Sequence, residues 1–165
     1  DPAAGDLLDA LAAFPHVVHI RSFGKFFGMA GLRLGFAIGA AVHMDQLQRC
    51  VGPWAVSSVA LDIGNTALND TVWQAQHSQF LRQQTEQLQM VLTRANLKIL
   101  GGTTLFQTIQ TSRANHLHDH LATAAIWTRK FSQMPDLLRF GVPATAADFA
   151  RLSESLNNWR HKANQ

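Results

Sequence analysis

A serine, a lysine and an arginine within one glycine-rich stretch are the side chains of this sequence best suited to chemistry. The stretch reads Ser22-Phe-Gly-Lys25-Phe-Phe-Gly-Met-Ala-Gly-Leu-Arg33-Leu-Gly35. A lysine amine can condense with an aldehyde, whereas a hydroxyl and a guanidinium both donate hydrogen bonds to a phosphate. The three side chains therefore predict a site for an aldehyde cofactor that carries a phosphate group.

Each of these residues also has a simpler interpretation. A lysine in a glycine-rich loop is usually a solvated side chain, and only the combination with Ser22, Arg33 and the flanking glycines favours a catalytic role for Lys25. Arg33 could form a surface ion pair. A charge inside an otherwise apolar loop needs a ligand or a carboxylate to neutralise it, and we interpret that ligand as the cofactor phosphate.

The elements around the stretch must hold this loop in place. We expect a buried strand over 17–20 and a second short strand over 36–38, separated by glycines that demand an irregular backbone. Helices are predicted over 7–14, 44–49 and 56–68, followed by a long amphipathic helix over 71–94 that Asp70 or Thr71 caps. This first half predicts βα elements of a parallel sheet.

The second half has the pattern of a small α+β layer. Short strands are predicted over 98–100, 105–109, 126–128 and 137–140, with helices over 112–124 and 146–159. The change in character after Asn96 predicts three parts: residues 1–70, a connecting helix over 71–95, and a small domain over 96–165.

Composition excludes several classes of protein. The 165 residues are 47% hydrophobic and 15% charged, as in a globular protein, and the net charge of +3 comes from scattered Lys and Arg, which argues against nucleic-acid binding. No apolar run is long enough to predict a membrane span, and no secretory leader opens the sequence. The single Cys50 fits a reducing compartment, so we expect a cytoplasmic protein.

The glycine-rich stretch resembles the lysine loop of a known family. The pattern S-x-x-K followed by G-L-R-x-G resembles the fold-type I pyridoxal-phosphate enzymes, the aspartate-aminotransferase superfamily of classes I and II, and RSFGKFFGMAGLRLGF is most similar to its threonine-phosphate decarboxylase branch. The resemblance implies an α/β fold, made of the C-terminal part of a large cofactor-binding domain and an α+β small domain. It also implies that Lys25 holds pyridoxal 5'-phosphate as a Schiff base, with Ser22 and Arg33 on the cofactor phosphate.

The implied reaction is the decarboxylation of L-threonine O-3-phosphate to aminopropanol phosphate in cobalamin biosynthesis, by a homodimer. An aminotransferase of the histidinol-phosphate type is the alternative, because it shares the fold, the lysine loop and the carboxylate-binding arginine. The enzymes of this family are much longer than this sequence, and the resemblance assigns to their other half the remaining contacts to the cofactor ring. We therefore expect this segment alone to be inactive. A third hypothesis is a truncated scaffold without activity, which dimerises through its long helix and apolar surfaces.

The resemblance extends to the end of the chain. The segments 52–57, 101–106, 126–131 and 137–141 resemble later parts of the same enzymes, and the last two carry a two-arginine pattern. By this resemblance Arg139 binds the substrate α-carboxylate and Arg129 also contacts the substrate. The alternatives are an acid that pairs with Arg139 inside its apolar run, and a solvated strand end for Arg129.

Histidine and tryptophan residues offer two further candidates. His116, His118 and His120 suggest a metal site, since the first and last share one helical face, but an exposed amphipathic helix is the simpler interpretation and we predict no metal. Trp54, in the segment 52–57, could line the pocket.

Overall fold

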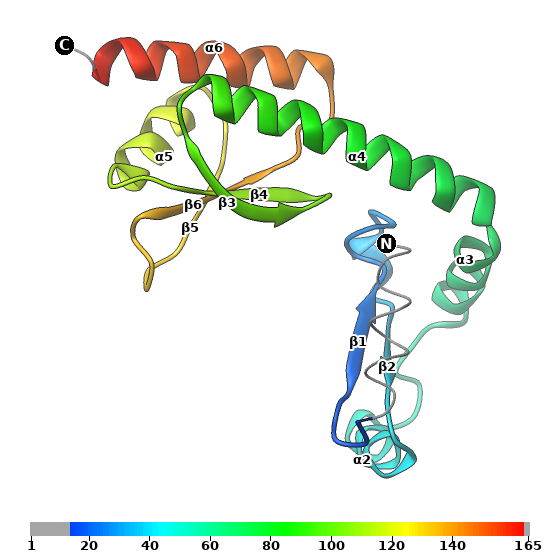
Figure 1. Cartoon of the computed structure of the whole chain (residues 1–165). Coiled ribbons are helices and arrows are strands. Elements are labelled where there is room, and N and C mark those ends of the chain that lie inside the picture. The colour runs from blue at the N-terminus through cyan, green and yellow to red at the C-terminus, as the bar shows by residue number, and fades with distance from the viewer. Residues whose placement is uncertain (1–13, 164–165) are drawn as a thin grey trace. The chain divides into compact units, whose positions relative to one another are not determined.

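The computed structural model describes residues 14–163 and divides into two compact units, Asp1–Ala75 and Gln76–Gln165. The boundary falls inside α4 (Thr71–Arg94), the long helix whose bounds agree with the sequence prediction (Figure 1). The helix predicted over 7–14 lies outside the described residues except for Phe14. The functional division at residues 70 and 95 stays a prediction.

In the first unit, β1 (His19–Ser22) and β2 (Gly35–Ile38) form a two-stranded antiparallel sheet. The predicted parallel arrangement of these two strands is wrong, because the connection between them contains only the short 3-10 helix η1 (Ala30–Leu32) and no crossover helix. The predicted burial of the first strand is also wrong, since the side chain of Ile20 is 72% exposed.

Two helices, α2 (Ala41–Val51) and α3 (Ser58–Asn69), lead from this sheet to α4. The Ser57 hydroxyl accepts a hydrogen bond from the Ala60 N–H at 3.2 Å and caps α3. One carboxylate oxygen of Asp70 accepts the Trp73 N–H at 2.9 Å, which confirms Asp70 as the predicted cap of α4. Helices α3 and α4 are therefore held at their first turns by side-chain oxygens.

The second unit contains a four-stranded antiparallel sheet in the order β3-β4-β6-β5. Its strands are β3 (Lys98–Thr103), β4 (Phe106–Gln110), β5 (Arg129–Lys130) and β6 (Leu137–Gly141). The strand predicted over 126–128 begins only at Arg129. The reason is the end of α5 (Ala114–Thr123), where the Ile126 N–H donates to Leu121 O and the Ala125 N–H donates to Ala122 O, with Ala125 at a φ of 56°. These bonds close the helix and occupy the residues before the strand.

Helices cover one face of this sheet. The later part of α4, together with α5 and α6 (Ala146–Ala163), packs on the face from which Ile109, Leu138 and Phe140 point (Figure 1). Because side chains alternate along a strand, Thr108 and Arg139 lie on the opposite face. The core thus fixes which side chains the other face presents. No helix among the described residues is long and apolar enough to cross a membrane.

The remaining core residues come mainly from the three helices. They are Leu88, Leu92, Ala95, Ala114, Leu117, Leu121, Phe149, Leu152 and Leu156. The hydroxyl of Thr85, on α4, donates to the Thr104 carbonyl at 2.9 Å and ties the helix to the turn between β3 and β4.

Candidate functional site

The hairpin of the first unit brings Ser22, Lys25 and Arg33 onto one loop. Ser22 is the last residue of β1 and lies opposite Gly35. The Phe23 N–H donates to Leu34 O at 3.2 Å, so the two ends of the loop are joined next to both Ser22 and Arg33. The structure therefore places the hydroxyl and the guanidinium at the base of the loop that carries the lysine.

Lys25 opens a tight turn within this loop. The Gly28 N–H donates to the Lys25 carbonyl at 2.9 Å, and Gly28 has a φ of 68°, which favours glycine. At Gly35 an added Cβ would lie 2.8 Å from the Arg21 carbonyl oxygen, so the strand pair leaves no room for a side chain there. These two glycines meet the prediction that the stretch needs an irregular backbone and a close approach.

Arg33 adopts the left-handed conformation, with a φ of 56°, and its guanidinium donates to the Ala30 carbonyl at 3.0 Å. Ser22, Lys25 and Arg33 are all exposed. Among the described residues no carboxylate lies within ion-pair distance of Lys25 or Arg33. The donor set of one amine, one hydroxyl and one guanidinium fits a ligand that has an aldehyde and a phosphate.

The second unit presents a pair of arginines. Arg129 on β5 lies directly opposite Arg139 on β6, and Arg139 in turn lies opposite Thr108 on β4. Arg139 is half-buried, with its guanidinium carbon 4.6 Å from the centre of the Phe106 ring, and Arg129 is exposed. Like charges directly opposite one another destabilise a sheet. An anion between the guanidinium groups would relieve that repulsion.

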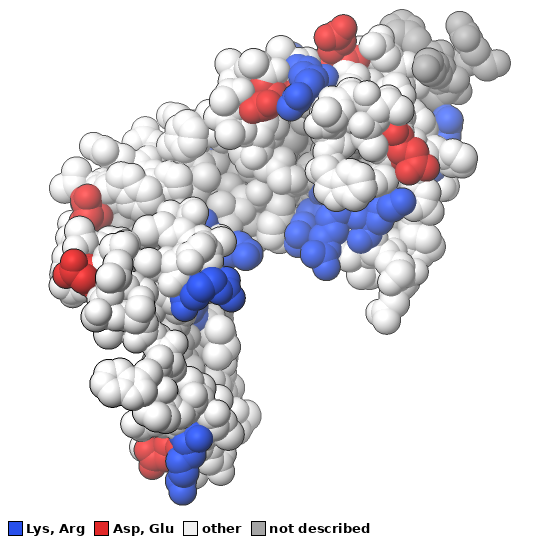
Figure 2. Space-filling view, turned by 180° about the vertical axis from the view of Figure 1, so that it is seen from behind, with Lys and Arg blue, Asp and Glu red and all other residues white. Residues whose placement is uncertain are grey.

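No acid neutralises this pair within the part of the chain that the structure describes. The neighbouring Lys130 does have a carboxylate partner, Asp119, at 3.8 Å. Figure 2 shows Lys and Arg side chains gathered over the sheet of the second unit. The open face of this sheet therefore suits an anionic ligand. Phe106 and Thr108 were not predicted from the sequence, because their place beside Arg139 depends on strand pairing.

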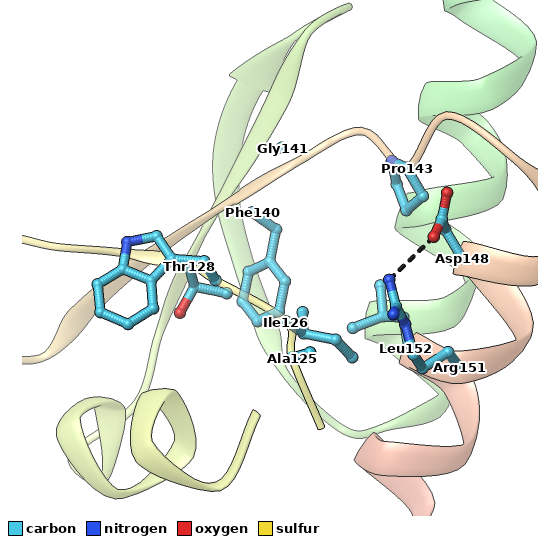
Figure 3. Close-up of a pocket in the computed structure, with 10 residues that line it drawn as sticks. Ala125, Ile126, Thr128, Phe140, Gly141, Pro143, Asp148, Arg151 and Leu152 are labelled. Carbon is cyan, nitrogen blue, oxygen red and sulfur yellow. Dashed lines mark hydrogen bonds and ion pairs between the residues drawn. The ribbon is translucent and has the colours of Figure 1, made fainter. Parts of the chain in front are cut away.

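A cavity of about 180 Å³ lies elsewhere in the second unit, between the sheet and α6 (Figure 3). An ion pair between Asp148 and Arg151, 2.9 Å long, lies at its side. None of the five predicted site residues lines it. Its lining consists of Ala125, Ile126, Trp127, Thr128, Phe140, Gly141, Pro143, Asp148, Arg151 and Leu152.

Two of the three histidines of α5 have hydrogen-bonding partners in the second unit. His118 is buried, with Nδ1 2.8 Å from the Thr128 hydroxyl, and His120 Nε2 lies 2.9 Å from the Ser155 carbonyl. The predicted exposed face is thus wrong for His118, which falls on the apolar side of the helix. Among the side chains that the structure describes, no group of three or more His, Cys, Asp or Glu is arranged to hold a metal ion.

Trp54 lies in a strained, exposed segment. The residue is 96% exposed and its φ is 62°. It does not line the cavity of Figure 3. Its predicted place in a ligand pocket stays a prediction.

Comparisons of the sequence with known proteins agree on one family. The family model described as aminotransferase class I and II matches residues 2–156. The threonine-phosphate decarboxylase of Pseudomonas aeruginosa is 39% identical over 158 residues, which cover 96% of this chain and 47% of that protein. A histidinol-phosphate aminotransferase of Oleidesulfovibrio alaskensis is 36% identical over 99 residues, which cover 60% of this chain and 26% of that protein.

Solved structures share the fold. The histidinol-phosphate aminotransferase of Sinorhizobium meliloti, in complex with pyridoxal-5'-phosphate, superposes with a TM-score of 0.78 at 19% identity, over 94% of this chain and 44% of that one. The predicted fold class, part of a large α/β domain with a small α+β domain, is confirmed. The chain spans about half the length of the curated decarboxylase that it matches.

Proposed function

The chain belongs to the aminotransferase class I and II family, and from that membership we propose that it is part of a pyridoxal-phosphate enzyme that decarboxylates L-threonine O-3-phosphate. The observation that carries this proposal is the 39% identity to a threonine-phosphate decarboxylase over 96% of the chain. The product would be aminopropanol phosphate, and the pathway cobalamin biosynthesis. The single cysteine supports a cytoplasmic location.

In this proposal each residue of the lysine loop has one task. Lys25 supplies the amine that condenses with the cofactor aldehyde, and its exposed position on the tight turn leaves the amine accessible. Ser22 and Arg33, at the base of the loop, donate hydrogen bonds to the cofactor phosphate. When bound, pyridoxal phosphate supplies an electron-accepting ring that stabilises the charge left when a bond to the substrate Cα breaks.

The arginine pair would bind the amino acid substrate. Arg139 is half-buried against Phe106, where a guanidinium binds a carboxylate more strongly than it does in open water. We assign the substrate α-carboxylate to Arg139 and a second anionic contact to Arg129. L-Threonine O-3-phosphate carries a carboxylate and a phosphate, so it suits a face with two cations that lack an acidic partner among the described residues.

The domain bounds and the oligomeric state are part of the same proposal. Residues 1–70 would belong to the cofactor-binding domain, 71–95 to a connecting helix and 96–165 to the small domain. We further propose a homodimer, as the resemblance to the family implies. The large apolar side chains that the first unit exposes, among them Ile20, Ile38, Val59 and Leu61, suit contact with the rest of the large domain or with a second copy. Sedimentation of the full-length protein across a concentration series would measure its oligomeric state.

The test of the cofactor assignment is chemical trapping in the full-length protein. Borohydride reduction after addition of pyridoxal phosphate should leave the cofactor mass on the peptide that contains Lys25, and not on the peptide that contains Lys98, which is also exposed. A Lys25→Ala variant should show no adduct at this peptide. An adduct spread evenly over exposed lysines, or none at Lys25, would contradict the assignment and favour the inactive scaffold.

The test of the reaction compares two products. With L-threonine O-3-phosphate the protein should release carbon dioxide and aminopropanol phosphate, without an amino acceptor. The alternative is an aminotransferase of the histidinol-phosphate type, which relatives of that name support over a shorter stretch. That enzyme would instead transfer the amino group to a 2-oxo acid and release no carbon dioxide. The same assay on this chain alone would test whether the segment is inactive by itself.

A further inference from the structure

The two residues after Lys25 belong to a cluster of stacked aromatic rings. The Phe27 ring stacks on the indole of Trp73, with centroids 5.8 Å apart and planes 14° apart, and Phe26 meets the same indole edge-on at 5.8 Å. Phe27 also stacks on Phe23 at 4.6 Å. The turn that carries Lys25 is therefore held to the start of α4 by ring contacts.

Phe23 and Trp73, at the two ends of this cluster, are each held in place by further contacts. Phe23 is 2% exposed, and its ring lies close to Gly64 of α3, where an added Cβ would overlap the side chain of Leu34. Trp73 lies in the first turn of α4, where Asp70 accepts its backbone N–H. The Gln74 side chain next to it donates to two carbonyls at the end of α3, at 2.9 and 3.0 Å.

Lys25 itself has few constraints. Its side chain is exposed, and no carboxylate among the described residues lies within ion-pair distance of it. Its backbone is constrained by the Gly28 hydrogen bond inside the turn, but that bond does not join the turn to any helix. The rings of Phe26 and Phe27 make contact with α4, so they orient the turn relative to the rest of the unit.

We propose that Trp73 is a positioning residue for the proposed reaction, because its ring sets the place of the Lys25 amine by clamping Phe26 and Phe27. This inference rests on the proposed role of Lys25 and extends it. A covalent bond forms quickly only when the reacting atoms are held at the right separation and angle, and a misplacement of about 1 Å can cost roughly 100-fold in rate. A ring that acts only as packing would change stability without changing that geometry.

The test compares three variants of the full-length protein: Trp73→Ala, Trp73→Phe and, as the matched control, Trp127→Ala. Trp127 is 81% exposed and lies outside the proposed machinery. The first readout is the rate at which pyridoxal phosphate becomes trappable by borohydride on Lys25. The second is the split between kcat and KM for the amino acid substrate.

We expect Trp73→Ala to slow trapping at Lys25 and to lower kcat by about tenfold or more, while KM changes much less. Trp73→Phe restores a flat ring that can still stack, so it should recover most of the trapping rate. Trp127→Ala should match the wild type in both readouts. Circular dichroism would show whether Trp73→Ala folds. If it does not, Phe27→Leu replaces it as the test, because leucine keeps an apolar side chain but removes the stacked ring, and this variant should show the same slow trapping.

The outcomes separate this inference from the function on which it rests. Trapping on Lys25 at the wild-type rate in folded Trp73→Ala, or in Phe27→Leu when the former does not fold, would overturn the inference alone. So would a folded Trp73→Phe that traps as slowly as Trp73→Ala. A wild-type protein that gives no adduct on Lys25 would overturn the proposed function and this inference with it.

Discussion

Replacing Arg129 with glutamine should stabilise the protein, although it weakens the proposed anion site. Arg129 lies directly opposite Arg139 in the β5–β6 pair, and neither has an acidic partner among the described residues. Cross-strand side-chain pairs change stability by roughly 0.2–1 kcal/mol, and like charges directly opposite one another are destabilising. Arg129→Gln should therefore raise the free energy of unfolding by roughly 0.5 kcal/mol at low salt.

Salt provides the diagnostic for this effect. The Debye length falls from about 30 Å at 0.01 M to about 3 Å at 1 M, so the gain from Arg129→Gln should almost vanish in about 1 M sodium chloride. Urea denaturation followed by tryptophan fluorescence, at both salt concentrations, would measure it.

Lys130 offers the matched control for this change. It is the next residue on the same strand and loses the same charge in Lys130→Gln, but it pairs with Asp119 at 3.8 Å. That variant should be unchanged or destabilised by up to about 0.5 kcal/mol. Equal shifts in the two variants, or a gain at Arg129 that survives high salt, would refute the argument that the arginine pair is an unneutralised site.

Two further substitutions test how the second unit is built. Gly102→Ala should destabilise the β3–β4 hairpin by about 1–3 kcal/mol in urea denaturation, because the new Cβ would overlap the Phe106 carbonyl oxygen, whereas Gly141→Ala in the same sheet meets nothing within 4 Å and should be tolerated. Thr85→Val should cost about 1 kcal/mol in the same assay, because it removes the hydrogen bond to the Thr104 carbonyl; an unchanged midpoint would mean that this bond contributes nothing.

Local patterns predict the local features of the fold. The helical spacing of apolar residues indicates the bounds of α4, and the residue type at Asp70 correctly indicates its cap. The composition of β1 and β2 does not reveal their antiparallel pairing, because a strand has the same composition in either direction; the connection decides it, since it holds no crossover helix. The late start of β5 depends on the left-handed conformation of Ala125, which is uncommon for a residue other than glycine.

The same distinction applies to the candidate site. The residues of the lysine loop are close neighbours along the chain, so their types and spacing alone indicate a shared role. The placement of Arg129 opposite Arg139, and of Thr108 on the other side of Arg139, comes from strands that are separated in the chain. Likewise, no sequence pattern predicts that Trp73 stacks on Phe27, since the contact joins a loop to a helix many residues later.

The uneven distribution of the core has a consequence for handling the chain in the laboratory. The continuous cluster of buried apolar residues extends from Leu88 to Leu156, whereas the buried apolar side chains described in the first unit are Phe23, Leu34 and Ala60. Segments with fewer buried contacts open more often and are cut first by proteases. Brief digestion of this chain should therefore nick the first unit early and leave a resistant product that retains the second.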